Sequence, residues 1–477
     1  MAAGMPIKHT WSESDRLVPR NVVQPLQRVL EHEAAGGVVM LVAAAIAILW
    51  ANSPWQDAYF DLWSTPLRVE LGNVINLDHL ALREWVNDAL MTAFFLLVGV
   101  EIKREAVHGD LRDPKAVLAP IIAAFGGMIV PAAIYWSFNA GGAGADGWAV
   151  PMATDIAFAV GVVTLLGKRV PLAAKIFLLT LAVADDIGAI VVIAVFYTGD
   201  MSWGWFACAL LGLAVIFVMR RSDVQSLAPY LAVGSFIWLS LLEAGVHATL
   251  AGVALGLLTP AWPLKSPRRF PQAARHQINE IERAYYDRVI TGAEFSEGEQ
   301  RIDEVARLAM FSTSPMERLE RKLSPWVAYV VVPVFALANA GVTFTGDAIS
   351  GLASEPITLG VLLGLVVGKT IGVFGASVVA IKLGVGRLPT GATWRTMLGL
   401  AMTAGVGFTV ALFVTSISFD DPALADKAKI GILFGSTLAG VIGYTMLRLV
   451  TPTATAEAVD PQPEVEDAGA EAVPQPV

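Results

Sequence analysis

The chain has 477 residues, of which 55% are hydrophobic and only 16% are charged, and its formal net charge is −9. Soluble globular chains carry about 25% charged residues, so this composition excludes an ordinary soluble protein and predicts an integral membrane protein. No basic region is present for a nucleic acid, and the single cysteine, Cys208, excludes an internal disulfide framework. We expect no cofactor, because no histidines and cysteine lie at zinc-ligand spacing.

Residues 1–33 are polar and of mixed charge, without a cleavable secretory signal, and we expect them to form a cytoplasmic segment. Apolar stretches that suit a hydrocarbon core of about 30 Å follow along residues 34–450. They predict an all-α membrane domain with twelve transmembrane helices, near 34–51, 85–101, 116–137, 149–166, 175–197, 203–219, 228–242, 245–259, 325–340, 356–381, 395–417 and 428–449.

The lysines and arginines set the orientation of these spans. If the N-terminus is inside, seventeen of them fall in short inside segments and four in outside segments, leaving out the long loop between the eighth and ninth spans. Both termini are therefore predicted to be cytoplasmic.

Three segments outside the spans have patterns of their own. The cytoplasmic insertion at about 264–324 alternates acids and bases, which suits one or two short helices or a solvated spacer. Residues 451–477 form an acidic tail rich in Pro and Ala, which we expect to be disordered. Residues 67–74 alternate in polarity and predict a small external hairpin.

Two adjacent carboxylates, Asp185 and Asp186, lie in the middle of the fifth span, roughly 15 Å along the helix from Lys175. Ionisable groups at this depth cost roughly 2.5–3.5 kcal/mol each, so each needs a partner or a function. Neighbours on a helix point about 100° apart, so one aspartate can face a water-filled cavity while the other faces a neighbouring helix. Packing of both acids against other donors is the structural alternative.

Lys369 lies near the middle of the tenth span, and we expect it to pair with Asp185 or Asp186. A purely structural ion pair is the alternative to a role in the site. Gly360, Gly364 and Gly368 precede it at every fourth residue, which predicts a face where another membrane helix approaches closely.

The fourth and eleventh spans are each interrupted at mid-depth, the fourth around Pro151, Thr154 and Asp155 and the eleventh around Gly405 and Gly407. Each is the middle span of a three-span unit, spans 3–5 and 10–12, and the two units enter the membrane from opposite sides. This pattern indicates inverted repeats whose broken helices form a binding site. Broken helices leave partial charges at their ends, which Asp155 and Lys369 can offset; direct contact between Asp155 and an ion is the alternative.

Glu101 and Glu105 share a helix face at the cytoplasmic end of the second span, with Arg104 one turn from Glu101. An interfacial charge cluster and a funnel that attracts cations both fit this spacing. His247 begins the eighth span at the outer interface, where capping or packing is the default role.

With these residues in view, the chain resembles the NhaA family of bacterial Na⁺/H⁺ antiporters, over roughly residues 31–450. The resemblance is carried by residues 87–91 (NDALM), 94–99 (FFLLVG), 153–158 (ATDIAF), 185–190 (DDIGAI), 245–252 (GVHATLAG) and 368–369 (GK). It implies a multi-pass protein of the bacterial cell membrane that extrudes Na⁺ or Li⁺ in electrogenic exchange for external H⁺ and serves sodium and pH homeostasis.

The resemblance also implies roles for individual residues. Asp186, helped by Asp185, would bind Na⁺ or Li⁺, Asp185 would pair with Lys369, and Thr154 and Asp155 would lie at a helix crossing. The implied pH-response region comprises Glu101, Arg104, Glu105, Glu320 and His247. Two departures, an insertion of about 40 residues after Pro263 and Arg321 and Ser324 in place of the family's histidines, put the pH profile in doubt.

Three other classes compete with an antiporter. A passive cation channel would show rings of acids or repeated filter strings, which the sequence lacks. An intramembrane aspartyl protease would need Asp155 and Asp186 on facing helices. A Na⁺-coupled organic-solute symporter also uses broken-helix repeats, and it remains the alternative function. The sequence leaves the oligomeric state open, with a homodimer as one option, and predicts no enzyme activity.

Overall fold

The structure, a computed structural model, describes residues 35–71, 75–76, 80–109, 114–199, 201–224, 226–264, 270–286, 292–344 and 354–451. This part of the chain is almost entirely helical. It contains eight helices that are long and apolar enough to cross a membrane, or up to ten if two bent helix pairs each count as one span. The predicted all-α, multi-span class is therefore confirmed. The predicted segment 1–33 and the tail beyond Thr451 lie outside the described residues.

The long helices fall on the predicted apolar stretches. They are α4–η3–α5 (Leu82–Trp85, Val86–Leu90 and Met91–Val107), α6 (Pro114–Asn139), η5–α7 (Ala145–Met152 and Ile156–Leu165), α8 (Leu172–Phe196), α9 (Trp203–Arg221), α14–η8–α15 (Pro315–Trp326, Val327–Val331 and Val332–Asn339), α17–η10–α18 (Pro356–Leu363, Gly364–Gly368 and Lys369–Lys382) and α21 (Pro422–Val450). The bent pairs are α2 (Ala35–Ala51) with α3 (Gln56–Ser64), at 115°, and α19 (Trp394–Thr403) with α20 (Phe408–Ser418), at 44°. The remaining membrane-region helices are η6 (Gly167–Arg169), α10 (Leu227–Glu243) and α11 (Leu250–Leu258).

The eighth predicted span is shorter than expected. Gly245 adopts a φ of +74°, and the Val246 N–H donates to the Leu241 carbonyl, which ends α10 in a turn. Helix α11 therefore begins at Leu250 and not at residue 245. Helix α3, which follows the turn at Ser53, is an element that the hydropathy pattern did not predict.

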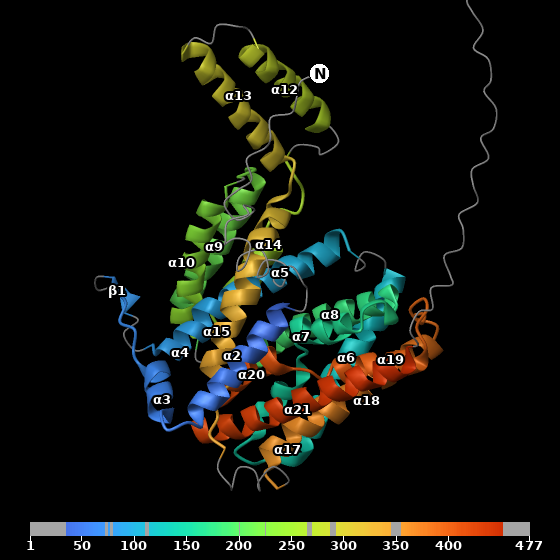
Figure 1. Cartoon of the computed structure of the whole chain (residues 1–477). Helices are drawn as coiled ribbons and strands as arrows, with labels where there is room; N and C mark the ends of the chain where they lie inside the picture. Colours follow the sequence, from blue (N-terminus) through green and yellow to red (C-terminus); the bar gives the residue numbers. More distant parts are fainter. Residues whose placement is uncertain are drawn as a thin grey trace, which may run out of the picture.

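The helices form two bundles. The carboxylate bundle consists of α6, α7, α8 and α17–α21, and the flanking bundle consists of α2, α5, α9–α11, α14 and α15. The bundles meet along α5 and α8, α2 and α7, and α15 and α20. Figure 1 shows the chain folding back, so that α2, at the start of the described residues, lies beside α15.

Glycines allow the closest helix approaches inside each bundle. A Cβ atom on Gly126 or Gly372 would collide with the backbone of the other residue's helix, where α6 crosses α18. A Cβ atom on Gly368 would collide with Pro131 of α6, one on Gly360 with Asn139 and Tyr135 of the same helix, and one on Gly364 with Pro151 of η5. The predicted small-residue face on the tenth span is thus confirmed, and it holds the Lys369 helix tightly against α6.

The insertion between the eighth and ninth predicted spans contains two helices, α12 (Phe270–Tyr286) and α13 (Gly292–Phe311), which confirms the helical alternative. They pack on each other and project from one end of the molecule (Figure 1). Helix α14 follows α13 directly and begins with a capping box, in which Ser314 and Glu317 each accept a backbone N–H of the other at 3.2 Å.

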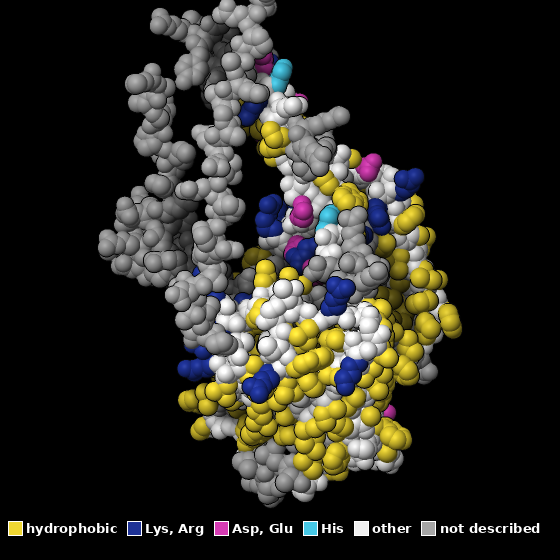
Figure 2. Space-filling view, turned by 90° about the vertical axis from the view of Figure 1, so that its right-hand side faces the viewer, with side chains coloured by type: hydrophobic (Ala, Val, Ile, Leu, Met, Phe, Trp, Pro, Cys, Tyr) yellow, Lys and Arg dark blue, Asp and Glu magenta, His cyan; other side chains and the backbone are white. Residues whose placement is uncertain are grey.

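A hairpin is present near the predicted position, as a two-stranded antiparallel sheet of β1 (Glu70–Leu71) and β2 (Ile75–Asn76), but its second strand lies beyond the predicted range 67–74. Large apolar side chains cover the outside of the helices, including Trp203 at 73% exposure and Leu449 at 78%. Figure 2 shows this hydrophobic surface over the lower part of the molecule, with the visible acidic and histidine side chains lying mainly above it. Such a surface suits contact with lipid.

Candidate ion-binding site

Asp185 and Asp186 lie in the middle of α8 and have different surroundings. Asp185 is fully buried, and its Oδ2 atom lies 2.5 Å from the Lys369 Nζ atom of α18. Asp186 is 3% exposed and lines a cavity between the two bundles. This difference follows from the rotation of about 100° between neighbouring helix positions.

The cavity has a volume of about 430 Å³ and polar and apolar walls. The acidic residues that line it are Glu101 of α5, Asp155 and Asp186. The other lining residues come from both bundles and include Gly36, Met40, Leu97, Val160, Ser324, Tyr329, Val332 and Val410. The Oδ1 atoms of Asp185 and Asp186 are buried and have no hydrogen-bond partner among the described residues. A buried carboxylate oxygen facing a cavity is a ready ligand for a cation or a proton.

Lys369 follows the π-helical turn η10, which carries its side chain into the contact with α8. Its Nζ atom also donates to the Thr154 hydroxyl at 3.1 Å, and that hydroxyl donates to the Ala404 carbonyl at 2.8 Å. Thr154 and Ala404 belong to the interruptions of two different spans. Lys369 therefore connects Asp185 of α8 with Thr154 and, through the Thr154 hydroxyl, with Ala404.

Asp155 caps both broken helices. Its Oδ1 atom accepts the Phe158 N–H of α7 at 3.0 Å, and its Oδ2 atom accepts the Thr409 N–H and hydroxyl of α20, at 3.0 and 2.6 Å. The Asp155 N–H in turn donates to the Val406 carbonyl at 2.7 Å, so the two interruptions lie against each other. One carboxylate thus offsets the positive ends of two helices.

Thr409 is a site residue that sequence reasoning missed. Its signal was a hydroxyl residue directly after the glycine-rich interruption at Gly405 and Gly407. In the structure it is 2% exposed and supplies two donors to Asp155.

Four of the five residues assigned to the pH-response region come together at one mouth of the cavity. Arg104 forms a close ion pair with Glu320 of α14 and lies 3.5 Å from Glu105, and Glu101, one turn away on α5, lines the cavity. Of the two positions that the sequence analysis noted as departures, Ser324 lines this mouth and Arg321 is exposed.

His247 lies elsewhere. Its Nε2 atom donates to the Tyr197 carbonyl at the end of α8, at 2.8 Å. Helix α11 crosses α5 with Gly252 against Thr92 and Gly256 against Gly99, so the residues before α11 lie toward the end of α5 opposite Glu101. The structure therefore does not bring His247 into the cluster around Arg104.

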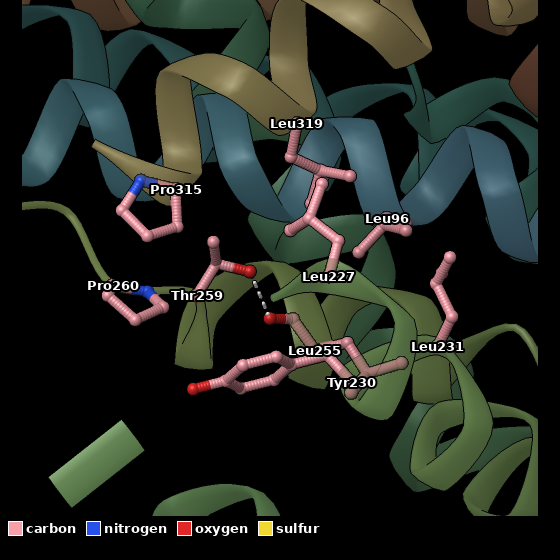
Figure 3. A pocket seen from close by; sticks show the side chains of 9 residues that line it. All are labelled: Leu96, Leu227, Tyr230, Leu231, Leu255, Thr259, Pro260, Pro315 and Leu319. Carbon is pink, nitrogen blue, oxygen red and sulfur yellow. Dashed lines mark hydrogen bonds between the residues drawn. The ribbon is translucent and has the colours of Figure 1, made fainter. Parts of the chain in front are cut away.

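A second pocket, between α5, α10, α11 and α14, is apolar (Figure 3). Leu96, Leu227, Leu231, Leu255 and Leu319 point into it, and the hydrogen bond drawn there runs within one turn, from the Thr259 hydroxyl to the Leu255 carbonyl at 2.8 Å. Its lining residues include no carboxylate, so it is not suited to bind a cation.

The described residues contain no group of three or more His, Cys, Asp or Glu side chains that could hold a resident metal ion. What they contain is a pair of buried aspartates reached by a cavity between two helical bundles, beside two interrupted helices. That combination defines a membrane protein that moves an ion between compartments.

The comparisons identify the family. The model for Na⁺/H⁺ antiporter 1 matches residues 27–447, and the chain belongs to this family. It is 42% identical to Na(+)/H(+) antiporter NhaA 2 of Sorangium cellulosum over 94% of both chains. It is 44% identical to Na(+)/H(+) antiporter NhaA of Anaeromyxobacter sp., over 94% of this chain and 96% of that protein.

A solved sodium proton antiporter from Methanocaldococcus jannaschii is 12% identical and aligns with a TM-score of 0.46, covering 90% of this chain and 98% of that one. With its family and its apolar helices, the protein is a multi-pass protein of the bacterial inner membrane.

Proposed function

We propose that this Na⁺/H⁺ antiporter exchanges Na⁺ or Li⁺ for protons at Asp186, with Asp185 as the second carboxylate of the site. The observation that carries the assignment is the Asp186 side chain, which is buried, lines the cavity and has an Oδ1 atom without a hydrogen-bond partner among the described residues. A cation that is bound mainly by the oxygens of these two carboxylates can be released again, as transport requires.

Competition for the same oxygens couples the two ions. When the carboxylates lose protons to the cytoplasm, their negative charge attracts Na⁺ through the mouth at Glu101. Protons that arrive from the outside displace it after the bundles have moved relative to each other. Because the two aspartates are adjacent, they titrate as a coupled pair and not as independent sites.

The electrogenic exchange of two protons for one Na⁺ is part of the proposal. The second proton is carried by Asp185 or by Lys369, whose contact of 2.5 Å must change if either gains or loses a proton. We assign Thr154 and Asp155 to holding the helix crossing, because their hydrogen bonds go to the two interruptions.

The proposed topology has twelve spans and cytoplasmic termini, with spans 3–5 and 10–12 as inverted repeats. The helices fall on all twelve predicted stretches, although α10 and α11 are short. Interruptions at corresponding places, residues 153–155 and 404–407, support the repeats.

We assign the pH response to Glu101, Arg104, Glu105 and Glu320 at the mouth, and to His247 at the end of α8. A homodimer is compatible with this topology.

The test is Na⁺-induced dissipation of a preset pH gradient in everted vesicles between pH 6.5 and 8.5. Wild-type protein should respond, and Asp186→Asn should reduce the response at least about tenfold, because the amide cannot hold both a cation and an exchangeable proton. The exposed Asp57 supplies the matched control, Asp57→Asn, which should behave as wild type.

Robust exchange by correctly inserted Asp186→Asn would refute the site. If the wild-type protein gave no response to Na⁺ or Li⁺ at any pH, the alternative function, a Na⁺-coupled organic-solute symporter, would take its place. That class would show solute uptake that rises with Na⁺ without proton movement.

A further inference from the structure

A third cavity lies in the carboxylate bundle, where η10 and α18 meet α19 and α21. Its volume is about 220 Å³. Val367 and Ile371 line it and are 39% and 56% exposed, so the cavity opens on the surface of the bundle. These residues flank Lys369, in the middle of the span Pro356–Lys382, and the opening therefore lies at the depth of the hydrocarbon core. The lining residues come from all three spans and include Val366, Val367, Thr370, Ile371, Met402 and Ile442.

The walls of this cavity suit a hydrocarbon chain. Among the lining residues only Thr370 carries a hydroxyl, and this hydroxyl already donates to the Val366 carbonyl at 2.6 Å. A bound water molecule needs about two to four polar partners, so the cavity does not suit water. Cavities for drug-sized ligands measure about 300–1,000 Å³, whereas this smaller one suits a segment of a single chain. At this depth the surrounding molecules are lipids, whose acyl chains would gain dispersion contacts with the apolar wall.

The cavity wall is directly connected to the candidate ion-binding site. Val366 and Val367 belong to the π-helical turn η10, and Lys369 follows this turn and pairs with Asp185. The Lys369 N–H donates to the Gly364 carbonyl, five residues back, where an α-helix would use the carbonyl four residues back. Because π-turns are rare in proteins, the shape of this one depends on what packs against it.

Two elements of the wall also contact the interruption between α19 and α20. Leu365, which lies in η10 beside the lining residues, is fully buried, and a Cβ atom on Gly405 or Gly407 would collide with it. Met402 lines the cavity two residues before Ala404, whose carbonyl accepts a hydrogen bond at the ion-binding site. A molecule in the cavity would therefore support both η10 and the end of α19.

We propose that the acyl chain of a phospholipid binds in this cavity and holds η10 in the position that places Lys369 beside Asp185. The cavity holds the hydrocarbon and does not select a head group, because none of its lining residues is charged. The lipid is a positioning ligand and takes no part in ion binding. Its importance for transport rests on the proposed exchange, whereas its binding does not.

Photo-crosslinking tests the binding. The full-length protein is reconstituted into liposomes of phosphatidylethanolamine and phosphatidylglycerol, with a small fraction of phosphatidylcholine that carries a diazirine in the middle of one acyl chain. After irradiation, mass spectrometry locates the adducts. We expect about tenfold more adduct on Met402, on the cavity wall, than on Leu211 of α9, which is 64% exposed.

Two variants fill the cavity, and a matched control leaves it open. Val367→Phe places a phenyl ring in the cavity and should lower the adduct on Met402 about tenfold. Ile442→Phe fills the cavity from α21 and tests the proposal even if Val367→Phe does not fold. The control is Val379→Phe, at a position that is 53% exposed on α18 and outside the cavity, and it should leave the adduct unchanged.

Amide hydrogen exchange tests the support of η10. Removal of bound lipid in detergent should raise the exchange of residues 364–370 about tenfold, and added phospholipid should restore the protection. Val367→Phe should show no difference between the two conditions, since its cavity admits no chain, whereas Val379→Phe should behave as the parent. Neither measurement requires transport, so their outcome is distinguishable from that of Asp186→Asn.

The proposal is overturned if Met402 carries no more adduct than Leu211, or if both filling variants fold and keep the adduct of the parent. It is also overturned if lipid removal leaves the exchange of residues 364–370 unchanged. If Val367→Phe instead converts a dimer into a monomer in light scattering, a second copy of the chain covers this surface and the acyl chain does not.

Discussion

At the residue scale, the site depends on three buried ionisable side chains, Lys369, Asp185 and Asp186, of which only the first two form an ion pair. Lys369 pairs with Asp185 at 2.5 Å, whereas the described residues leave the Oδ1 atom of Asp186 without a hydrogen bond. The paired aspartate and the cavity-facing aspartate therefore have different tasks. Asp155, although buried, has both oxygens occupied by donors from α7 and α20.

Removing Lys369 tests the pair. In Lys369→Met the fully buried Asp185 loses its cationic partner, and we expect the free energy of unfolding to fall by about 3–5 kcal/mol. Thermal denaturation in detergent measures the loss. The double variant Lys369→Met/Asp185→Asn should recover part of it, because no uncompensated charge remains; a single variant as stable as wild type would contradict the pairing.

At the element scale, close helix crossings fix where these side chains meet. Helix α18 carries Lys369 and lies against α6 at Gly126 and Gly372, where neither position has room for a Cβ atom. The crossing sets the rotation and height of α18, and these place the Lys369 ammonium at Asp185 and Thr154.

Two glycines of α18 offer a matched comparison. Gly372→Ala forces a methyl group against the Gly126 carbonyl and should lower the free energy of unfolding by about 1–3 kcal/mol. Gly375 has no atom within 4 Å of its Cβ position, so Gly375→Ala should be neutral or stabilising by up to about 1 kcal/mol. Melting temperatures of the two purified variants check this, and equal shifts would show that the crossing is loose.

At the scale of the whole molecule, the ion path lies between two bundles, and the α12–α13 insertion lies outside both. Two contacts that do not involve the insertion hold helix α14 on the flanking bundle. They are the Arg104–Glu320 ion pair and the hydrogen bond from the Met316 N–H to the Pro260 carbonyl, at 3.2 Å. The insertion therefore leaves and re-enters the membrane domain at nearly the same point.

Replacing residues 265–312 by a short Gly/Ser linker should consequently preserve Na⁺/H⁺ exchange in everted vesicles. The comparison variant is Glu320→Gln in the full chain, which breaks the ion pair to Arg104 and should alter the pH dependence of exchange. If the shortened protein inserts correctly but no longer exchanges ions, the insertion takes part in transport.

Much of this arrangement could be predicted from local patterns. Apolar stretches located the helices, the glycines and Pro151 located both interruptions, and the cost of burying charge singled out Asp185, Asp186 and Lys369. Hydrophobicity, helix-breaking residues and the cost of burying a charge are properties of short segments in a bilayer. They act in the same way whatever the neighbouring segments are.

Other features depended on how the helices pack. The spacing left Lys369 with two aspartates to choose from, and the rotation of α8 against α18 selected Asp185. Thr409 became a partner of Asp155, and His247 was separated from the Arg104 cluster, because helix crossings join residues more than 200 positions apart and separate others. The order of residues thus determines which groups must be compensated inside the membrane, while tertiary packing alone decides which partner each one meets, since burial penalises any unpaired charge but does not specify its partner.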